Sequence, residues 1–404
     1  MYQAYDIRGV YPKEINATST IFLSRKFFEF LKKKQLPTKV LLAFDARPSS
    51  AFLGEVFTRV FPGQIENIGL VPVPLYYHLV LKRKLPGVMI TASHLPQRYN
   101  GFKFFLPTNE MWVYQKDIPT ANAASQRSHS SKLKPEIKPE LYLDYLKTLK
   151  RLTNFAVKAK IKFNSPTSLN RYVFKLLPKV FPTISLTPTA PWQLVSDLDG
   201  DRLFFYWRGQ KLLPEHVLNL VLQNSPYQKI GLTANLSQQI AKQFPGKEFI
   251  TIKTGHKNFK EAYRKIGIDF GFESSHHFHF FKDLRTEAPI LGLLKVLQTT
   301  AQLDLDKFLK QSKLYLWRFN VKLKPSRVKL LDDFLERFWG VTPVPKTELH
   351  LKKFDGLEIK HSTFRLHLRQ SNTEAKVRFF LEARNQVMLT TLKNIIKKLA
   401  GLQS

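Results

Sequence analysis

Short apolar runs alternate with amphipathic stretches along most of this chain, and that alternation restricts the folds open to it. Near the start, apolar runs at residues 39–45 and 87–92 enclose a stretch at 51–61 that has the 3.6-residue periodicity of a helix. Strand and helix patterns in turn are typical of α/β domains, in which helices cover the faces of a sheet. We therefore predict an α/β protein.

A chain of 404 residues is too long for one core of ordinary size, because domains commonly hold roughly 100–200 residues. A polar, serine-rich stretch at 119–139, bounded by prolines, is typical of a domain boundary. The alternation resumes after it, whereas the last part of the chain favours paired strands and a terminal helix. We predict three α/β domains and a small α+β domain, over residues 1–130, 131–227, 228–312 and 313–404.

The chain contains no cysteine. Disulfides, thiolate catalysis and zinc–thiolate sites are therefore excluded, and nothing indicates an oxidising compartment. The first residues lack the apolar core of a signal peptide, and no apolar run reaches the ~18 residues that a membrane span requires. We expect a soluble, cytoplasmic protein without a membrane partner.

The charge of the chain is unusual, since 64 lysine and arginine residues against 31 aspartate and glutamate residues give a formal net charge of +33. Such a field attracts polyanions and phosphorylated metabolites alike. No ribonucleoprotein, helix-turn-helix or zinc-finger pattern accompanies the charge, and lysine clusters such as 32–34 fall at the ends of expected helices. We expect no specific nucleic-acid partner, and a basic nucleic-acid binder is the least favoured alternative.

A serine follows the apolar run that begins at Gly87, within the segment GVMITASHLPQRYNGFKFF. Ser93 has His94 beside it and Lys103 ten positions later. Neighbouring residues on an extended chain point to opposite sides, so Ser93 and His94 cannot form a nucleophile–base pair. By itself the segment indicates a loop.

Three aspartates alternate in the segment SDLDGDRLFF. Asp197, Asp199 and Asp201 surround a glycine and precede Arg202. Alternate carboxylates on a turn converge on one hard cation, and Mg²⁺ favours oxygen ligands that leave room for phosphate. A solvated acidic turn is the alternative. In so basic a chain, an acidic cluster after an apolar strand favours a metal site.

Alternating polar residues also occur in the segment GFESSHHFHFF. Glu273, Ser275 and His277 face one side of an extended segment, where they would bind the vicinal hydroxyls of a sugar. The alternative is a metal held by His276, His277 and His279, which neither a paired carboxylate nor a cysteine supports.

A further polar segment, RQSNTEAKVRFF, lies near the C-terminus. Arg369, Ser371, Asn372 and Thr373 fall on an expected strand-to-loop turn. Hydroxyls, an amide, backbone N–H groups and a guanidinium together form a cradle for an oxyanion, and the forked donors of arginine suit phosphate. An ordinary polar hairpin turn is the alternative.

In this order the motifs resemble the α-D-phosphohexomutase family over essentially the whole chain. The segments AYDIRG, AFDARPSS, GLVPVP and KTGH, which begin at residues 4, 43, 69 and 253, add to the resemblance. It implies three similar mixed-sheet α/β domains plus a smaller C-terminal α+β domain around a central cleft, with one loop from each domain.

The resemblance also implies roles for the residues named above. Ser93 would carry a phosphoryl group, and Mg²⁺ would be held by Ser93 through a phosphate oxygen and by Asp197, Asp199 and Asp201. The other implied roles are charge neutralisation by Arg8, Lys103 and Arg202, proton transfer by His256, sugar binding by Glu273, Ser275 and His277, and binding of the non-reacting phosphate by Arg369, Ser371, Asn372 and Thr373.

Such an enzyme interconverts hexose 1-phosphate and hexose 6-phosphate, here of mannose or glucose, and serves carbohydrate metabolism. Glucose or mannose 1,6-bisphosphate would be its intermediate and activator. A catalytically degenerate sugar-phosphate-binding relative and a phosphoglucosamine mutase are the alternatives. We expect a monomer or a homodimer.

Several residues depart from the family pattern. Leu95 stands where the serine loop usually has asparagine, and Phe272 and His276 stand where the sugar loop usually has glycine. Bulky residues at glycine positions would narrow the pocket or shift the preference among hexoses. Gln370 and Ala375 replace prolines that are frequent in the phosphate loop, and the stretch between 181 and 192 is short enough to lack a strand–helix unit.

Overall fold

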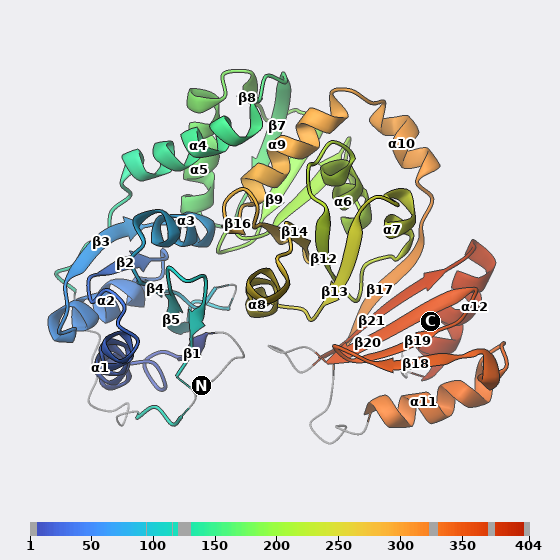
Figure 1. The fold of residues 1–404 in the computed structure, drawn as a ribbon, viewed down its shortest axis with the longest axis horizontal. Helices are drawn as coiled ribbons and strands as arrows, with labels where there is room; N and C mark the ends of the chain where they lie inside the picture. The colour runs from blue at the N-terminus through green and yellow to red at the C-terminus, as the bar shows by residue number, and fades with distance from the viewer. Residues whose placement is uncertain are drawn as a thin grey trace. The chain divides into compact units, whose positions relative to one another are not determined.

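A computed structural model describes residues 6–93, 95–114, 116–119, 131–322, 330–370 and 376–399. Strands and helices alternate along the chain, as Figure 1 shows, and the strands form four sheets. The predicted fold class is confirmed, since the first two sheets each combine parallel and antiparallel pairs and their strands are interleaved with helices. Within these ranges no helix is long and apolar enough to cross a membrane.

The first sheet carries the serine loop. Its strand order is β1-β5-β4-β2-β3, with β6 paired to β5. Parallel pairing of β2 with β3 and β4, and antiparallel pairing of β5 with β1 and β4, make the sheet mixed. The strands are β1 (Ile7–Val10), β2 (Val40–Phe44), β3 (Ile65–Leu70), β4 (Gly87–Ile90), β5 (Tyr99–Phe105) and β6 (Met111–Trp112).

Three helices accompany this sheet, namely α1 (Ala17–Lys33), α2 (Pro48–Val60) and α3 (Val73–Arg83). Phe27 of α1, Phe57 of α2 and Phe104 of β5 belong to one buried cluster, which fixes α1 and α2 to the sheet. The loop after β4 starts at the carboxyl edge of the parallel strands, where functional residues of α/β sheets commonly lie.

The second sheet carries the acidic turn. It has the order β11-β10-β9-β7-β8. The antiparallel pair β9–β10 encloses residues 197–202, so a hairpin presents the aspartates. Between α5 and β9 the chain forms the short strand β8 and no helix. The elements are α4 (Pro139–Thr153), β7 (Ala159–Asn164), α5 (Ser168–Val180), β8 (Ile184–Leu186), β9 (Trp192–Ser196), β10 (Leu203–Trp207) and β11 (Gln210–Lys211).

The third sheet carries the sugar loop. Its order is β13-β12-β14-β15-β16. The pair β14–β15 is antiparallel, with Phe272 opposite Phe278, and encloses residues 273–277. The elements are α6 (Pro214–Gln223), β12 (Lys229–Thr233), α7 (Gln239–Gln243), β13 (Glu248–Ile252), α8 (His256–Ile266), β14 (Phe270–Phe272), β15 (Phe278–Phe280), β16 (Thr286–Glu287), α9 (Pro289–Thr300) and α10 (Leu305–Gln311).

The fourth sheet is antiparallel throughout, as expected for an α+β domain. Its order is β17-β21-β20-β19-β18. Phe338 of α11, Leu366 of β20 and Leu392 of α12 share its buried core. The elements are β17 (Tyr315–Lys322), α11 (Leu330–Val341), β18 (His350–Lys353), β19 (Leu357–Lys360), β20 (Phe364–Gln370), β21 (Lys376–Ala383) and α12 (Gln386–Leu399).

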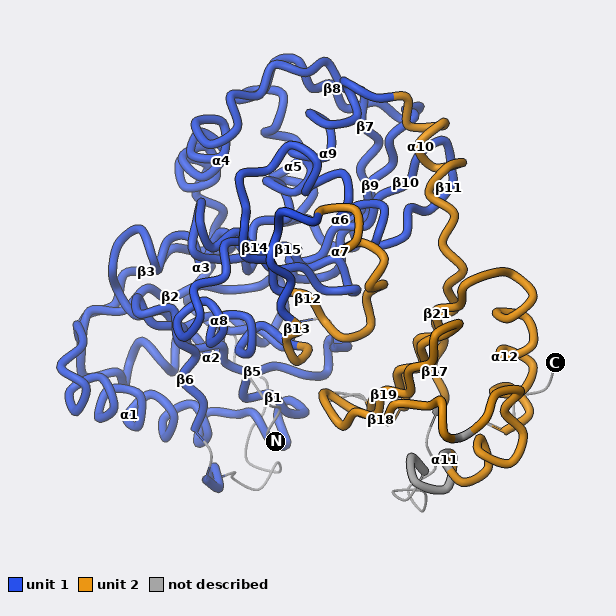
Figure 2. The backbone as a smooth tube through the Cα atoms, turned by 45° about the vertical axis from the view of Figure 1, so that its right-hand side comes forward, with its two compact units in different colours: residues 1–231, 245–250, 255–303 blue, residues 232–244, 251–254, 304–404 orange. Residues whose placement is uncertain are grey.

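The chain divides into two compact units, which Figure 2 distinguishes by colour. The first unit comprises residues 1–231, 245–250 and 255–303, and the second comprises 232–244, 251–254 and 304–404. This division is coarser than the four predicted domains, whose boundaries stay a prediction. The serine, metal and sugar loops all belong to the first unit.

Candidate active site

Ser93 lies in the loop that follows β4 and is held in an uncommon backbone conformation. Its φ is +56°, and its N–H donates to Thr91 Oγ1 at 2.9 Å. A residue other than glycine in this left-handed region is uncommon, and such residues gather at functional sites. The buried Ser93 hydroxyl donates a hydrogen bond to Asp199, which joins the serine loop to the acidic turn.

Arg47, just before α2, holds the serine loop in place. Its guanidinium donates hydrogen bonds of 2.6–3.0 Å to four backbone carbonyl oxygens, those of Ser93, Leu95, Pro96 and Tyr99. Asp45 orients the guanidinium from 2.9 Å. The loop therefore keeps a defined path although Leu95 replaces the usual asparagine. Sequence reasoning placed Arg47 in the segment AFDARPSS but assigned it no role.

The three aspartates of the acidic turn converge as predicted. One oxygen from each of Asp197, Asp199 and Asp201 lies within 4.8 Å of the others. Gly200 has a φ of +74°, and a Cβ there would approach Asn170 Oδ1 to 2.3 Å. The Asn170 amide donates to the Asp197 carbonyl at 2.8 Å, so a glycine and a buried asparagine shape this turn.

Within the aspartate cluster, burial and mutual repulsion act most strongly on Asp197. Burial, then Asp201 and Asp199, raise the pKa of Asp197 well above its usual value. Asp199 Oδ1 is buried and has no hydrogen-bond partner among the described residues. Three close carboxylates, two of them with a buried oxygen that has no hydrogen-bond partner among the described residues, fit a divalent cation that prefers oxygen ligands.

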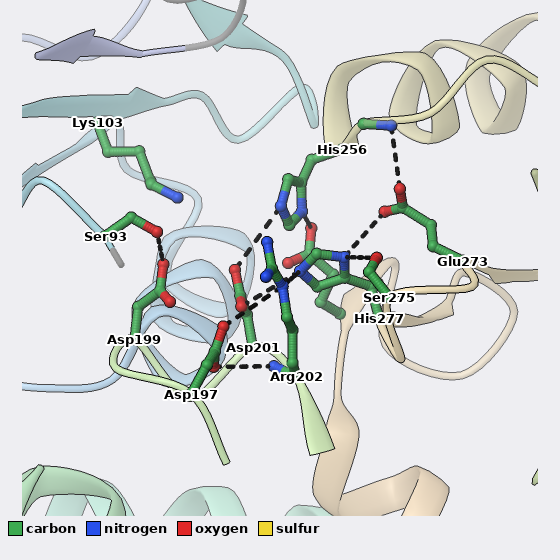
Figure 3. Close-up of polar contacts among 12 residues, drawn as sticks. Ser93, Lys103, Asp197, Asp199, Asp201, Arg202, His256, Glu273, Ser275 and His277 are labelled. Carbon is green, nitrogen blue, oxygen red and sulfur yellow. Dashed lines mark hydrogen bonds and ion pairs between the residues drawn. The ribbon is translucent and has the colours of Figure 1, made fainter. Parts of the chain in front are cut away.

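Two buried cations lie beside the serine and the acidic turn. Arg8 of β1 and Lys103 of β5 both face Asp6, with Arg8 hydrogen-bonded to it and Lys103 Nζ at 3.6 Å. Burial alone would raise the pKa of Asp6, but Arg8 and Lys103 lower it to about 2. Asp6, in turn, raises the pKa of both cations against the effect of burial, which keeps them charged. Figure 3 shows Lys103 beside Ser93.

The sugar loop approaches the acidic turn in the same unit. His277 Nε2 lies 3.3 Å from Asp201 Oδ1, and His277 Nδ1 lies 3.0 Å from Ser275 Oγ and 3.2 Å from Glu273 Oε1 (Figure 3). Burial would lower the pKa of His277, but Asp201 and Glu273 raise it to about 10, so the ring is protonated at neutral pH. An isolated antiparallel bridge pairs Arg202 with His277, which ties the metal hairpin to the sugar loop.

His256 is the first residue of α8 and stands between two carboxylates. Its Nε2 lies 3.7 Å from Asp201 Oδ2, and its Nδ1 lies 2.7 Å from Glu287 Oε1. Lys260, one turn further along α8, lies 3.5 Å from the same Glu287 oxygen. Glu287 and Lys260 were missed by sequence reasoning, because only the fold brings the end of β16 to the first turns of α8.

Phe272 and His276 occupy the positions where the sequence predicts a narrowed pocket. The structure instead places their rings in hydrophobic packing. Phe272 is fully buried against Phe278 at 4.9 Å, and the His276 ring lies 4.9 Å from Phe204 of β10. His276 has a φ of +64°, a conformation that costs a residue other than glycine about 1–2 kcal/mol. Aromatic packing offsets that cost, and the alternative metal site of His276, His277 and His279 does not form.

The predicted phosphate loop belongs to the second unit. Arg369, near the end of β20, is buried, and its Nε lies 3.8 Å from Asp355 Oδ2. Asp355 also accepts hydrogen bonds from the backbone and the hydroxyl of Thr254, at 2.9 and 2.7 Å. Gln370 ends β20, whereas Ser371, Asn372, Thr373 and Ala375 lie outside the described residues.

The first unit thus assembles a serine, an acidic turn that could hold a cation, two buried cations and a loop of polar side chains. Figure 3 shows the side chains of Ser93, Asp199, Asp201, His256 and Glu273 converging on one region. A serine beside a magnesium-type site, with neighbouring arginine and lysine, defines a phosphoryl-transfer enzyme on an α/β scaffold. The roles of individual residues stay a prediction.

Comparison with known proteins agrees with this class. Two models described as phosphoglucomutase/phosphomannomutase α/β/α domain I and domain III match residues 1–113 and 219–315. A phosphomannomutase of Methanocaldococcus jannaschii is 25% identical, over 99% of this chain and 98% of its own length. The chain belongs to the α-D-phosphohexomutase family, whose members are mutases of the isomerase class.

Solved structures show the same fold. A phosphoglucomutase/phosphomannomutase family protein of Burkholderia thailandensis superposes with a TM-score of 0.75 at 20% identity, over 98% of this chain and 97% of its own. An N-acetylphosphoglucosamine mutase of Aspergillus fumigatus, solved with GlcNAc-6P and magnesium, has a TM-score of 0.58 at 14% identity, over 92% and 84%. These likenesses extend along nearly the whole chain.

Proposed function

We propose that this protein interconverts the 1-phosphate and the 6-phosphate of mannose, glucose or both, through a phosphorylated Ser93. The hydrogen bond between Ser93 and Asp199 carries the proposal, because it joins the nucleophile to the carboxylate turn from 106 positions away in sequence. Phosphoryl transfer needs chiefly positioning and charge neutralisation, and both are built into this unit.

Mg²⁺ fits the acidic turn. Asp197, Asp199 and Asp201 offer only oxygen, and the buried Asp199 Oδ1 has no hydrogen-bond donor within the described ranges. A phosphate oxygen on Ser93 would complete the site. When bound, the ion neutralises charge on the transferring phosphoryl group. The magnesium in the Aspergillus fumigatus structure supports this assignment by analogy.

The chain's own residues supply the rest of the transfer. A sugar hydroxyl attacks the phosphorus, so a new oxygen–phosphorus bond forms while the bond to Ser93 Oγ breaks. Oγ leaves as an alkoxide, and in the second half-reaction it attacks the other phosphate and breaks the bond between that phosphate and its sugar oxygen. Arg8 and Lys103 balance the charge of the moving group, and His256, held by Glu287, takes the hydroxyl proton. In the second half-reaction the other phosphate returns to Ser93, and His256 gives the proton back. The enzyme is then phosphorylated on Ser93 again, as it was before the first half-reaction.

The sugar and its fixed phosphate need separate recognition. Glu273, Ser275 and His277 offer an acceptor, a hydroxyl and a protonated ring to the hexose hydroxyls. Arg369, with Ser371, Asn372 and Thr373, would hold the non-reacting phosphate. The SNTE and YNGFK segments favour mannose or glucose over glucosamine, and the 1,6-bisphosphate is the proposed intermediate and activator.

A coupled assay tests the proposal. Mannose 1-phosphate, glucose 1-phosphate and glucosamine 1-phosphate are compared with Mg²⁺ and catalytic glucose 1,6-bisphosphate. We expect Ser93→Ala to abolish turnover, and the same change at the exposed Ser185 to leave it intact. No turnover on all three sugars, by protein whose intact mass shows phosphorylation, refutes the proposal in favour of a sugar-phosphate-binding relative.

A further inference from the structure

His279 of β15 is a buried histidine beside the sugar loop to which the proposed chemistry gives no role. Its side chain is fully buried, and its ring is stacked on Phe259 of α8 with centroids 4.5 Å apart and planes 6° apart. A second ring, Phe281, runs nearly parallel at 5.7 Å. These contacts fix the plane of the imidazole and therefore the directions in which its two nitrogens point.

Each nitrogen faces a different carboxylate. His279 Nε2 lies 3.1 Å from Glu273 Oε1, and His279 Nδ1 lies 3.7 Å from Glu287 Oε1. Glu273 Oε2 accepts the Gly255 N–H at 3.0 Å, so the carboxylate of the sugar loop is held at both oxygens. The other carboxylate, Glu287, is the partner of His256. One ring therefore stands between the two carboxylates that orient the proposed chemistry.

The protonation of His279 decides what it does there. Burial lowers its pKa despite Glu273 and Glu287, so the ring is neutral at neutral pH. A neutral imidazole has one N–H and one lone pair. The hydrogen bond assigns the N–H to Nε2, toward Glu273. The lone pair on Nδ1 then faces Glu287, with no hydrogen-bond partner in the part of the chain that the structure describes.

We propose that His279 is a positioning residue. Its Nε2–H holds Glu273 in place for the sugar, and its Nδ1 offers no proton to Glu287, so that Glu287 stays paired with His256. The inference rests on the proposed function and deepens it. A lone pair repels a carboxylate, so Glu287 turns to His256 at 2.7 Å and Lys260 at 3.5 Å. The neutral ring thus separates a sugar-binding carboxylate from one that serves proton transfer.

A second cation at the same place is the competing reading. One donor atom from each of His256, Glu273 and His279 lies within 4.8 Å of the others, and two histidines with a glutamate form a zinc-type set. Charge decides against it. The Glu273 carboxylate is already held by His279 and by the Gly255 N–H, and the Lys260 ammonium lies 3.5 Å from Glu287, so a divalent ion would displace these partners and add two buried positive charges.

Three substitutions separate positioning from packing. His279→Phe keeps the stack on Phe259 and removes both nitrogens. His279→Gln places an amide near the position of Nε2, and His279→Asn places one near Nδ1. We expect His279→Phe to raise KM for the hexose phosphate about tenfold, equivalent to ~1.4 kcal/mol, with kcat within about threefold. His279→Gln should recover most of the KM. His279→Asn should not, and by drawing Glu287 from His256 it should lower kcat.

The inference is overturned if His279→Phe keeps the wild-type KM, if His279→Gln is as impaired as His279→Phe, or if His279→Asn recovers as well as His279→Gln. Metal analysis after dialysis against Zn²⁺ is the second readout. An additional bound equivalent in wild type that His279→Phe lacks would establish the cation instead. If the wild type turns over no sugar phosphate, the proposed function fails by itself. Calorimetric Kd values for glucose 6-phosphate across the same variants then still test the inference.

Discussion

Replacing Arg47 by lysine would test whether the serine loop owes its shape to a single side chain. The planar guanidinium reaches four carbonyl oxygens at 2.6–3.0 Å, and Asp45 fixes its plane from 2.9 Å. A lysine keeps the positive charge but carries a compact ammonium group with three donors in a tetrahedral arrangement. It would reach one or two of the four carbonyls, so at least two lose their donor.

The cost follows from where those carbonyls lie. An unsatisfied buried acceptor costs about 1–3 kcal/mol. The loop borders a hollow of about 420 Å³ lined by Arg47, Ser93 and Leu95, which admits water to the released groups. Because water reaches them, each of two carbonyls that lose their donor costs an amount near the lower end of that range. The loop is then destabilised by about 2–4 kcal/mol in total. A displacement of about 1 Å at the nucleophile would lower kcat about 100-fold.

Hydrogen exchange and steady-state kinetics measure the two effects. We expect faster exchange over residues 93–99 and a fall in kcat in Arg47→Lys, with the rest of the first unit unchanged. Arg59→Lys is the matched control, because Arg59 is 75% exposed and, within the described ranges, its ion pair is with Glu55 one turn away. Wild-type kcat with unchanged exchange in Arg47→Lys would refute the reasoning.

Two further predictions concern the metal turn and the third sheet. Because burial and its neighbours raise the pKa of Asp197, Mg²⁺ must displace a proton, so its affinity should rise with pH. Titration calorimetry in buffers of different ionisation enthalpy measures the proton, and a heat that does not vary with buffer would contradict the shift. Gly271→Ala should destabilise the protein by about 1–3 kcal/mol, because its Cβ would lie 2.4 Å from Phe259 Cδ1. Denaturant unfolding measures this loss against Gly246→Ala, whose Cβ meets nothing within 4 Å, and equal midpoints would exclude the clash.

The convergence of the three aspartates could be predicted because alternate carboxylates on a turn have a recognisable pattern. Three alternating aspartates after an apolar strand favour a cation in so basic a chain, whereas the segment around Ser93 indicates a loop by itself and receives its role only from the resemblance of the motifs. Residues that act through others carry no such signal. Arg47 and Glu287 are ordinary charged residues in the sequence, and each acquires its role from contacts that only the folded chain provides.

The packing of the two residues at glycine positions could not be predicted for a related reason, and their effect on the hexose preference stays a prediction. A sequence shows that Phe272 and His276 are large, but it does not show the direction of their side chains. The volume is taken up against Phe204 and Phe278, on neighbouring strands whose pairing the sequence leaves open. The residues at 371–373 stay a prediction from their pattern.

The bridge between Arg202 and His277 has a consequence for the proposed bisphosphate intermediate. It joins the ends of two hairpins, and the Leu203 N–H donates to the His276 carbonyl at 3.4 Å beside it. The acidic turn and the sugar loop therefore move together as one rigid segment. A bisphosphate that must turn its second phosphate toward Ser93 cannot be reoriented by a movement of the sugar loop that binds it. The bisphosphate has to dissociate from the sugar loop, rotate without leaving the active site, and bind again to a loop that has not moved.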